Sequence, residues 1–307
     1  GAAAAPDSLS LRHAFSLRAG IAGSARFPGL ALCARGGRLV LFGGENGFRF
    51  FELVGAEARA AGTLETAGFA IDVRARNGYV YLANGRGGLH IGRLDAGGEV
   101  EWTEVLPVGD ARGIAFAGDL LVVAAGGGGA LFYRLEAPGR PVLIGRHDSP
   151  FYLSAVATSG TTAFFAGGLG GAEAVDFSDP SAARLVWRER LSEARGIDTD
   201  GRHLYVCDGF EGFKVYALGP RGRPSPLAAL DTPGWNCGAH LSGSILYLAE
   251  GGEGFLAVDV SDPAAPVALG TAEVGAIART VYARGTTVFV AAQMNGIAAV
   301  DASDPRR

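Results

Sequence analysis

Short apolar runs alternate with glycine-rich or polar turns along nearly the whole chain. The clearest stretch contains four such runs, at 237–241, 245–249, 255–260 and 266–271. They are separated by Ser242-Gly243, by a glycine-rich loop and by a Ser-Asp-Pro turn. The runs are rich in β-branched and aromatic residues, and no segment keeps a helical period. The pattern therefore predicts four consecutive β-strands.

This four-strand unit recurs about every 42 residues. A glycine followed by an apolar residue opens a strand in each copy, at Gly47, Gly88, Gly129, Gly171, Gly212, Gly254 and Gly296. Ser-Asp-Pro recurs at 178–180, 261–263 and 303–305, again one or two units apart. Four short strands per repeat of this length are typical of a propeller blade. Seven copies predict an all-β fold, a seven-bladed β-propeller of four-stranded antiparallel blades.

The two ends of the chain predict how the ring closes. The seventh repeat stops at 304–307, before its fourth strand, and an unassigned strand at 9–17 precedes the first repeat. Pairing this N-terminal strand with the last blade completes it and removes exposed sheet edges. We therefore expect a single propeller domain at 9–307, preceded by a flexible stub at 1–8.

Composition and charge narrow the possible partners and cofactors. The formal net charge is −4 and there is no basic run, so nucleic-acid binding is not expected. No apolar run reaches the ~18 residues that span a membrane. The three cysteines, Cys33, Cys207 and Cys237, are too few for a disulfide scaffold. No motif predicts a cofactor or a metal site.

The segment at 1–6 is small and featureless. It fits either the stub of a cleaved signal peptide or an added cloning remnant. The first alternative predicts export to the periplasm or the cell surface, and the second leaves the protein in the cytoplasm. The oligomeric state is left open.

Three segments carry a resemblance to a known family. They are GFLAVDVSDPAAPVALG at 254–270, GIAAVDASDP at 296–305 and EARGIDTDGRHLYVCDGFEGFKVY at 193–216. The chain resembles the LVIVP-repeat propellers, and the repeat covers nearly all of it from about residue 27. The resemblance implies a propeller that is commonly exported or surface-associated in bacteria and archaea, most often without an assigned chemistry. The second and third repeats depart from the pattern, since both lack Ser-Asp-Pro.

A ligand site is expected where the first strands of the blades begin, because these positions converge on the central channel. Phe69, Arg112, Arg195, Cys237 and Arg279 begin these strands, and the residue that follows each is small. Three positions further on lies a ring predicted to line the channel, with Cys33, Asp72, Asp198, His240 and Tyr282. The full predicted ligand site is Phe69, Arg112, Tyr152, Arg195, Asp208, Trp235, Asn236, Cys237, Glu250 and Arg279.

The chemistry of this predicted site suggests what it would bind. Arginines favour an anionic group, and Trp235 and Tyr152 favour a flat apolar one. The alternative is structural: the arginines tie blade to blade through backbone carbonyls or loop carboxylates such as Asp208, and the aromatic side chains fill gaps between blades.

Two functions from different classes remain open. The first is a non-catalytic recognition or scaffold propeller that binds a protein partner or a small molecule at the channel mouth. The second is an enzyme that acts on a small molecule bound there. Cys237 and His240 are three residues apart and should point to opposite faces of one strand, which disfavours a cysteine–histidine dyad.

Overall fold

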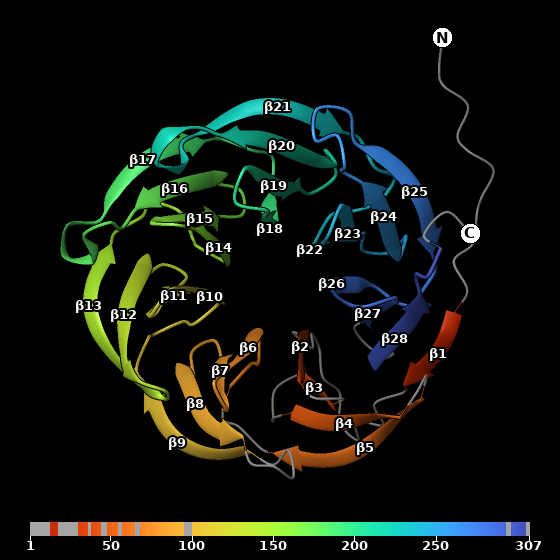
Figure 1. Ribbon diagram of the computed structural model, residues 1–307, viewed down its shortest axis with the longest axis horizontal. Helices are drawn as coiled ribbons and strands as arrows, with labels where there is room; N and C mark the ends of the chain where they lie inside the picture. Colours follow the sequence, from red (N-terminus) through yellow and green to blue (C-terminus); the bar gives the residue numbers. More distant parts are fainter. Residues whose placement is uncertain are drawn as a thin grey trace.

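The computed structural model describes the backbone of residues 13–17, 30–35, 38–43, 48–54, 57–64, 68–94, 100–292 and 296–304, and the side chains of residues 68–94, 100–292 and 298–304. Its strands lie in four concentric positions around a central axis (Figure 1). The innermost strands are β2 (Leu30–Arg35), β6 (Asp72–Arg76), β10 (Gly113–Ala117), β14 (Ala155–Ser159), β18 (Ala194–Thr199), β22 (Gly238–Ser242) and β26 (Ala278–Arg284). The second strands are β3 (Arg38–Gly43), β7 (Tyr79–Ala83), β11 (Leu120–Ala124), β15 (Thr162–Ala166), β19 (His203–Asp208), β23 (Ile245–Ala249) and β27 (Thr287–Ala292).

The outer two positions complete each sheet. The third strands are β4 (Phe48–Val54), β8 (Leu89–Leu94), β12 (Ala130–Ala137), β16 (Ala172–Asp176), β20 (Phe213–Leu218), β24 (Phe255–Asp259) and β28 (Gly296–Asp301). The outermost strands are β5 (Glu57–Leu64), β9 (Val100–Leu106), β13 (Arg140–His147), β17 (Arg184–Glu189), β21 (Pro224–Leu230), β25 (Val267–Ala272) and β1 (His13–Leu17). Two 3-10 turns, η1 (Pro180–Ala182) and η2 (Pro220–Gly222), precede β17 and β21.

These strands form seven four-stranded antiparallel sheets, the blades of a β-propeller. Six blades consist of four consecutive strands, from blade 1 (β2–β5) to blade 6 (β22–β25). Blade 7 is composite, because β26–β28 take β1 from the other end of the chain as their outermost strand. The all-β propeller and its predicted closure are therefore confirmed. The closing strand is described over His13–Leu17, and residues 1–12, which include the predicted stub at 1–8, lie outside the described residues.

The strands predicted for 237–271 agree with β22–β25 to within one residue. Their apolar runs are buried on both faces because each blade packs against the next. One hydrophobic cluster joins Tyr81 and Leu89 of blade 2 to Ile114 and Val123 of blade 3. Similar clusters join the blades from 3 to 7. The core is thus a series of layers between blades, held by burial of apolar surface.

The periodic glycine has a steric cause. Five of the seven marks lie among the described side chains, and each has a positive φ at the start of its third strand: Gly88, Gly129, Gly171, Gly212 and Gly254. A Cβ at any of them would lie 2.0–2.4 Å from a carbonyl oxygen at the end of the outermost strand of the same blade. Only glycine satisfies both conditions, so the period of the sequence reflects the period of the backbone.

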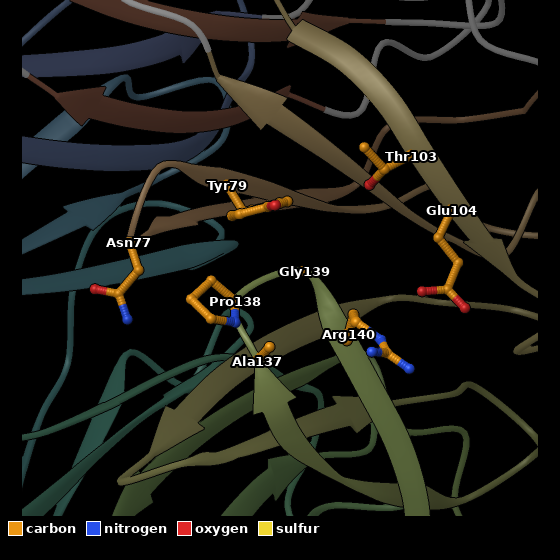
Figure 2. Close-up of a pocket in the computed structure, with 8 residues that line it drawn as sticks. All are labelled: Asn77, Tyr79, Thr103, Glu104, Ala137, Pro138, Gly139 and Arg140. Atoms are coloured by element: carbon orange, nitrogen blue, oxygen red, sulfur yellow. The ribbon is translucent and has the colours of Figure 1, made fainter.

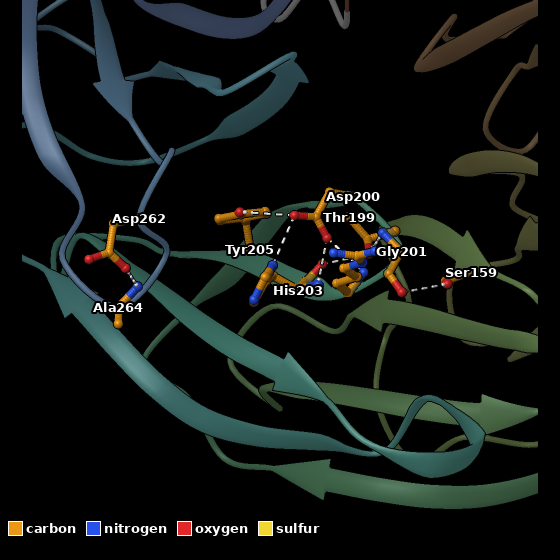
Figure 3. Close-up of polar contacts among 9 residues, drawn as sticks. Ser159, Thr199, Asp200, Gly201, His203, Tyr205, Asp262 and Ala264 are labelled. Atoms are coloured by element: carbon orange, nitrogen blue, oxygen red, sulfur yellow. Dashed lines mark hydrogen bonds and ion pairs between the residues drawn. The ribbon is translucent and has the colours of Figure 1, made fainter.

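The Ser-Asp-Pro turns are held by side-chain caps. The aspartate that ends the third strand accepts a hydrogen bond of 2.9 Å from the backbone N–H two residues later, at Asp176, Asp259 and Asp301. The aspartate of the turn caps it again: Asp262 Oδ1 accepts from the N–H of Ala264 at 3.1 Å (Figure 3). These bonds fix the reversal of the chain between the third and the outermost strand.

At the same end of the strands, Asp200 caps the turn between β18 and β19. Its Oδ1 accepts from the backbone N–H groups of Arg202 at 2.7 Å and His203 at 2.6 Å, and its Oδ2 lies 2.9 Å from Nδ1 of His203 (Figure 3). Partial burial opposes ionisation, but these bonds outweigh it and lower the pKa of Asp200. Ser159 of blade 4 donates to the carbonyl of Gly201 at 3.3 Å, which joins this turn to the preceding blade.

Among the described residues, no helix has the length and apolar character needed to cross a membrane.

Candidate functional site: the mouth of the central channel

A cavity of about 900 Å³ opens where the innermost strands begin. Blades 2 to 7 all contribute to its wall. The charged residues that line it are Arg74, Arg86, Arg112, Arg195, Arg279, Asp72 and Asp110. Its wall therefore carries three more positive than negative charges, although the whole chain is acidic. Six of the ten predicted ligand residues line this cavity: Phe69, Arg112, Arg195, Trp235, Cys237 and Arg279.

Close approach of neighbouring strands accounts for the small residues around the cavity. A Cβ on Gly196 would lie 2.8 Å from the Cα of Gly238, and a Cβ on Gly238 would lie 2.8 Å from the carbonyl oxygen of Arg279. The expectation that small residues mark converging backbones is confirmed here. The same convergence brings side chains of neighbouring blades into contact.

The first of these contacts is a clamp between blades 3 and 4. Arg112 pairs with Asp110, two residues earlier, with 2.9 Å between Nε and Oδ1. Its guanidinium carbon lies 5.0 Å from the ring centre of Tyr152 in the next blade, and the hydroxyl of Tyr152 donates to Asp110. Tyr152 is 45% exposed and lies beside the cavity without lining it. Arg112 is thus neutralised by its own loop and stacked on the neighbouring blade.

The same arrangement recurs two blades later, between blades 5 and 6. Arg195 pairs with Glu193, and its guanidinium carbon lies 4.8 Å from the ring centre of Trp235. The indole Nε1 donates to Glu193 at 2.6 Å. Two of the three predicted arginines therefore tie blade to blade, as the structural alternative expected. Their carboxylate partners are Asp110 and Glu193, not Asp208.

Arg279 breaks the pattern. The position two residues earlier holds Ile277, where the clamps hold an acid. The guanidinium carbon of Arg279 lies 4.9 Å from the ring centre of Trp235. Among the described residues, Arg279 forms no ion pair with a carboxylate. It is therefore a cation on the wall of the cavity, held against an aromatic face and without a counter-charge in the described part of the chain.

Three predicted ligand residues are buried beneath the loops instead of facing the cavity. Asp208 accepts from the backbone N–H of Glu193 at 2.8 Å and pairs with Lys214 at 3.0 Å. Asn236 donates to the hydroxyl of Thr232 at 2.6 Å. Glu250, at the same position of blade 6 as Asp208 in blade 5, is also buried. Asp208 and Glu250 lie where the second strand of the blade ends, under the loop that leads into the first strand of the same blade, and Asn236 belongs to such a loop. None of the three lines the cavity.

The predicted ring of channel residues has a second role, contact between innermost strands. Asp72 lines the cavity, and its Oδ2 accepts from the backbone N–H of Ile114 in the next blade at 2.8 Å. Asp198 makes the equivalent bond to Leu241, also at 2.8 Å. Burial raises the pKa of Asp72 even though Arg74 and this bond act to lower it.

The remaining members of that ring lie on blades 6 and 7. The rings of His240 and Tyr282 are 4.8 Å apart between centres, and Nδ1 of His240 lies 3.9 Å from Oδ2 of Asp198. Burial lowers the pKa of His240. The side chain of Cys33 lies outside the described residues. This ring thus contributes Asp72 to the cavity and packs His240 against Tyr282.

The two described cysteines are poor nucleophiles at neutral pH. Burial raises the pKa of the Cys237 thiol to about 11, and the nearby Arg279 and Arg195 only partly offset it. The thiol donates to the carbonyl of Trp235 at 3.2 Å. Cys207 is fully buried, and burial raises the pKa of its thiol also. Reactive cysteines need the thiolate, which neither environment favours. No group of His, Cys, Asp and Glu able to hold a metal ion occurs in the described part of the chain.

A second cavity, of about 540 Å³, lies at the opposite ends of the strands between blades 2 and 3 (Figure 2). Its floor is structural: the backbone N–H of Gly139 donates to the hydroxyl of Tyr81 at 3.1 Å, and the ring of Tyr79 lies against Gly139. Glu104 and Arg140 are its charged lining residues, so its charges balance. It offers a ligand less charge selectivity than the channel mouth.

The repeats of blades 6 and 7 match a known family. The model of the LVIVD repeat covers residues 233–273 and 275–306. Blades 6 and 7 of this propeller thus carry the LVIVD repeat. The match confirms the resemblance to a propeller repeat family that the sequence showed. The name of the matched repeat ends in aspartate, where the expected name, LVIVP, ends in proline. In the LVIVD repeats, the segments FLAVD (255–259) and IAAVD (297–301) end on Asp259 and Asp301, the two caps described above.

Solved structures resemble this propeller in fold. The structure of U3-55K has a TM-score of 0.72 at 10% identity, covering 92% of this chain and 97% of that one. The WD40 repeats of RRP9 have a TM-score of 0.71 at 11% identity, covering 92% and 96%. A catalytically inactive virginiamycin B lyase from Staphylococcus aureus, solved with quinupristin, has a TM-score of 0.70 at 13% identity, covering 94% and 98%. At such identities the likeness concerns the fold alone. No curated protein matches the chain.

Proposed function

We propose that this propeller is a non-catalytic recognition module that binds an anionic group with a flat apolar part at the channel mouth. The observation that carries the proposal is Arg279. Its guanidinium lies on the wall of the cavity against Trp235, and the acid that neutralises its counterparts Arg112 and Arg195 is replaced by Ile277. Guanidinium is the side chain best suited to hold a carboxylate or phosphate with two hydrogen bonds.

The surroundings of Arg279 support the same ligand. The lining of the cavity is positive overall, and a concave mouth concentrates that field on a ligand. Trp235 already holds the guanidinium groups of Arg195 and Arg279, but Phe69 of blade 2 lines the same cavity with an exposed aromatic ring. A ligand that joins an anion to an aromatic or planar group satisfies both features together.

The proposal is non-catalytic because the reactive groups near the cavity have other roles. The Cys237 thiol is held neutral, and His240 is packed against Tyr282. Asp72 is engaged with the backbone of the next blade. The enzyme alternative stays a prediction with no observation of its own in its favour.

Phenyl phosphate and phenylacetate test the proposal, because each joins a planar apolar group to an anion. Binding is measured by isothermal titration calorimetry on the parent and on Arg279→Gln. We expect both probes to bind the parent, and the substitution to weaken binding roughly tenfold or more, the scale of one charge-assisted contact. The melting temperature should change little, because Arg279 forms no ion pair among the described residues.

Arg112→Gln is the matched control, since it removes a clamped arginine from the same wall. We expect it to lower the melting temperature by breaking the contacts with Asp110 and Tyr152, with a smaller effect on affinity than Arg279→Gln. If neither probe binds the parent more tightly than it binds Arg279→Gln, the proposal is wrong.

A further inference from the structure

The loops between second and third strands form the rim of the channel mouth. Each loop lies beside the start of the next blade, through backbone bridges such as Gly168 to Ala194 and Gly209 to Asn236. The residue after the glycine of each bridge stands at the tip of the loop. In blades 2 to 6 these tips are Arg86, Gly127, Leu169, Phe210 and Gly252.

Two adjacent tips, on blades 4 and 5, are apolar and almost fully exposed. Leu169 is 82% exposed and Phe210 is 74% exposed, more than any other large apolar side chain among the described residues. The fold does not demand them, since glycine occupies the same position in blades 3 and 6. Large exposed apolar side chains beside a cavity commonly mark an interaction site.

The apolar tips are continuous with the basic mouth. Phe210 stacks on Trp235 with 6.4 Å between ring centres and 23° between planes. Trp235 in turn carries the guanidinium groups of Arg195 and Arg279. Leu169 lies one residue after the bridge that joins its loop to Ala194, the neighbour of Arg195. An apolar rim is thus continuous with Arg279, which forms no ion pair within the described ranges.

We infer that Leu169 and Phe210 form a docking surface for a segment of a partner protein that carries an acidic residue next to apolar side chains. The inference rests on the proposed function and names its ligand class. The apolar side chains would cover Leu169 and Phe210, and the carboxylate would enter the mouth and meet Arg279. Buried aromatic anchors beside an arginine are the usual centres of such interfaces.

A protein segment fits this surface better than a lipid bilayer. The cations lie on the wall of a concave cavity, where a side-chain carboxylate can enter and a flat array of headgroups cannot. The two exposed apolar tips also form a small, discrete patch on neighbouring loops, which suits side chains that dock individually.

Selection from a random peptide display library, with the purified full-length chain as bait, tests this inference. Selected peptides are synthesised, and their affinities for variants are measured by fluorescence polarisation. We expect enrichment of peptides with Asp or Glu within a few positions of Leu, Ile, Phe or Trp. The double variant L169S/F210S should weaken their binding at least roughly tenfold, and Arg279→Gln should do the same, since a few buried anchors dominate such interfaces.

The control is V142S/L143S, which removes two exposed apolar side chains from the outermost strand β13, away from the mouth. It should leave the affinities unchanged, and circular dichroism should show that both double variants are folded.

Phenyl phosphate separates this inference from the proposed function, because its binding should depend on Arg279 and not on Leu169 or Phe210. The docking surface is refuted if acidic–apolar peptides are not enriched, or if they bind L169S/F210S as tightly as the parent. Loss of phosphatidylglycerol vesicle binding in L169S/F210S, with no peptide enrichment, would assign the surface to a membrane instead.

Discussion

Glu250 is a buried carboxyl whose two oxygens lack a well-formed hydrogen bond among the described residues. Burial raises its pKa to about 7, and the charge of Glu253 adds to the effect. Thr232, the N–H of Gly234 and Asn236 lie close enough to favour the ionised form and only partly offset it. A buried carboxyl whose pKa is about 7 makes the stability of this propeller depend on pH.

The sign of that dependence follows from the two pKa values. In the unfolded chain the carboxyl titrates near 4.5, and in the folded protein near 7. Between these values the folded state holds a proton that the unfolded state has released, so stability falls as pH rises from about 4.5 to 7 and stays lower above 7. The difference is on the order of 3 kcal/mol. We expect Glu250→Gln to stabilise the fold at pH 8 and to have little effect at pH 4.

Urea unfolding of the parent and Glu250→Gln, at steps between pH 4 and pH 8, measures this difference. The control is Glu211→Gln, which replaces an exposed acid on the equivalent loop of blade 5. Its stability relative to the parent should not change with pH. A stability difference between parent and Glu250→Gln that does not change with pH would show that Glu250 does not titrate in this window.

The sequence predicts well which side chains converge, and less well which of them are free. The repeat period alone placed Arg112, Arg195 and Arg279 on one wall, because equivalent positions of a ring point to the same axis. Whether an arginine is neutralised depends on side chains within reach, here the acid two residues earlier. That signal was present in the sequence, as Asp110 and Glu193 against Ile277, and was missed. The exposed tips Leu169 and Phe210 were missed because exposure depends on neighbours that only the fold supplies.

At the scale of the element, each third strand starts at a glycine that satisfies two conditions at once. Gly254 has φ +87°, and a Cβ there would lie 2.4 Å from the carbonyl oxygen of Ala272. Gly243 has a similar φ, +61°, but open space where a Cβ would lie. The pair separates the cost of an unfavourable backbone conformation from the cost of a clash.

We expect Gly254→Ala to destabilise the propeller by roughly 2–4 kcal/mol, because backbone strain and overpacking add. Gly243→Ala should cost about 1 kcal/mol, since only the backbone term applies. Denaturant unfolding of both variants measures the difference. Equal costs would mean that the close approach to the outermost strand does not dictate the repeated glycine.

Element boundaries were predictable wherever turn chemistry is explicit. Ser242-Gly243 and the Ser-Asp-Pro turns mark the strands around them to within a residue, because caps and positive-φ glycines end strands sharply. The positions that close the second strands were harder. Asp208 and Glu250 look like exposed loop residues, but the loop that leads into the first strand of the same blade covers them, and the local sequence carries no sign of that contact.

At the scale of the whole molecule, stability comes from layers between blades, so each blade needs both of its neighbours. The hydrophobic clusters join residues about one repeat apart in the sequence, which is why a repeat seen in the sequence predicts the architecture. Closure of the ring is the one long-range contact that this repetition does not supply. It depends on β1, whose backbone pairs with β28 from His13↔Val300 to Leu17↔Ile297.

Two truncations test this closure. Deletion of residues 1–18 removes β1, and deletion of residues 1–12 leaves it in place. We expect the longer deletion to lower the melting temperature by roughly 5 °C or more, since losing a strand of the closing blade costs several kcal/mol. It should also promote self-association, because β28 then presents an unpaired edge. The shorter deletion should melt close to the parent. Differential scanning calorimetry measures the melting temperature, and sedimentation velocity measures self-association.

A synthetic peptide of residues 9–18, added to the longer deletion, should restore part of the lost stability. If both truncated proteins have the melting temperature of the parent and neither self-associates, then the ring does not depend on β1, and blade 7 is stable with three strands.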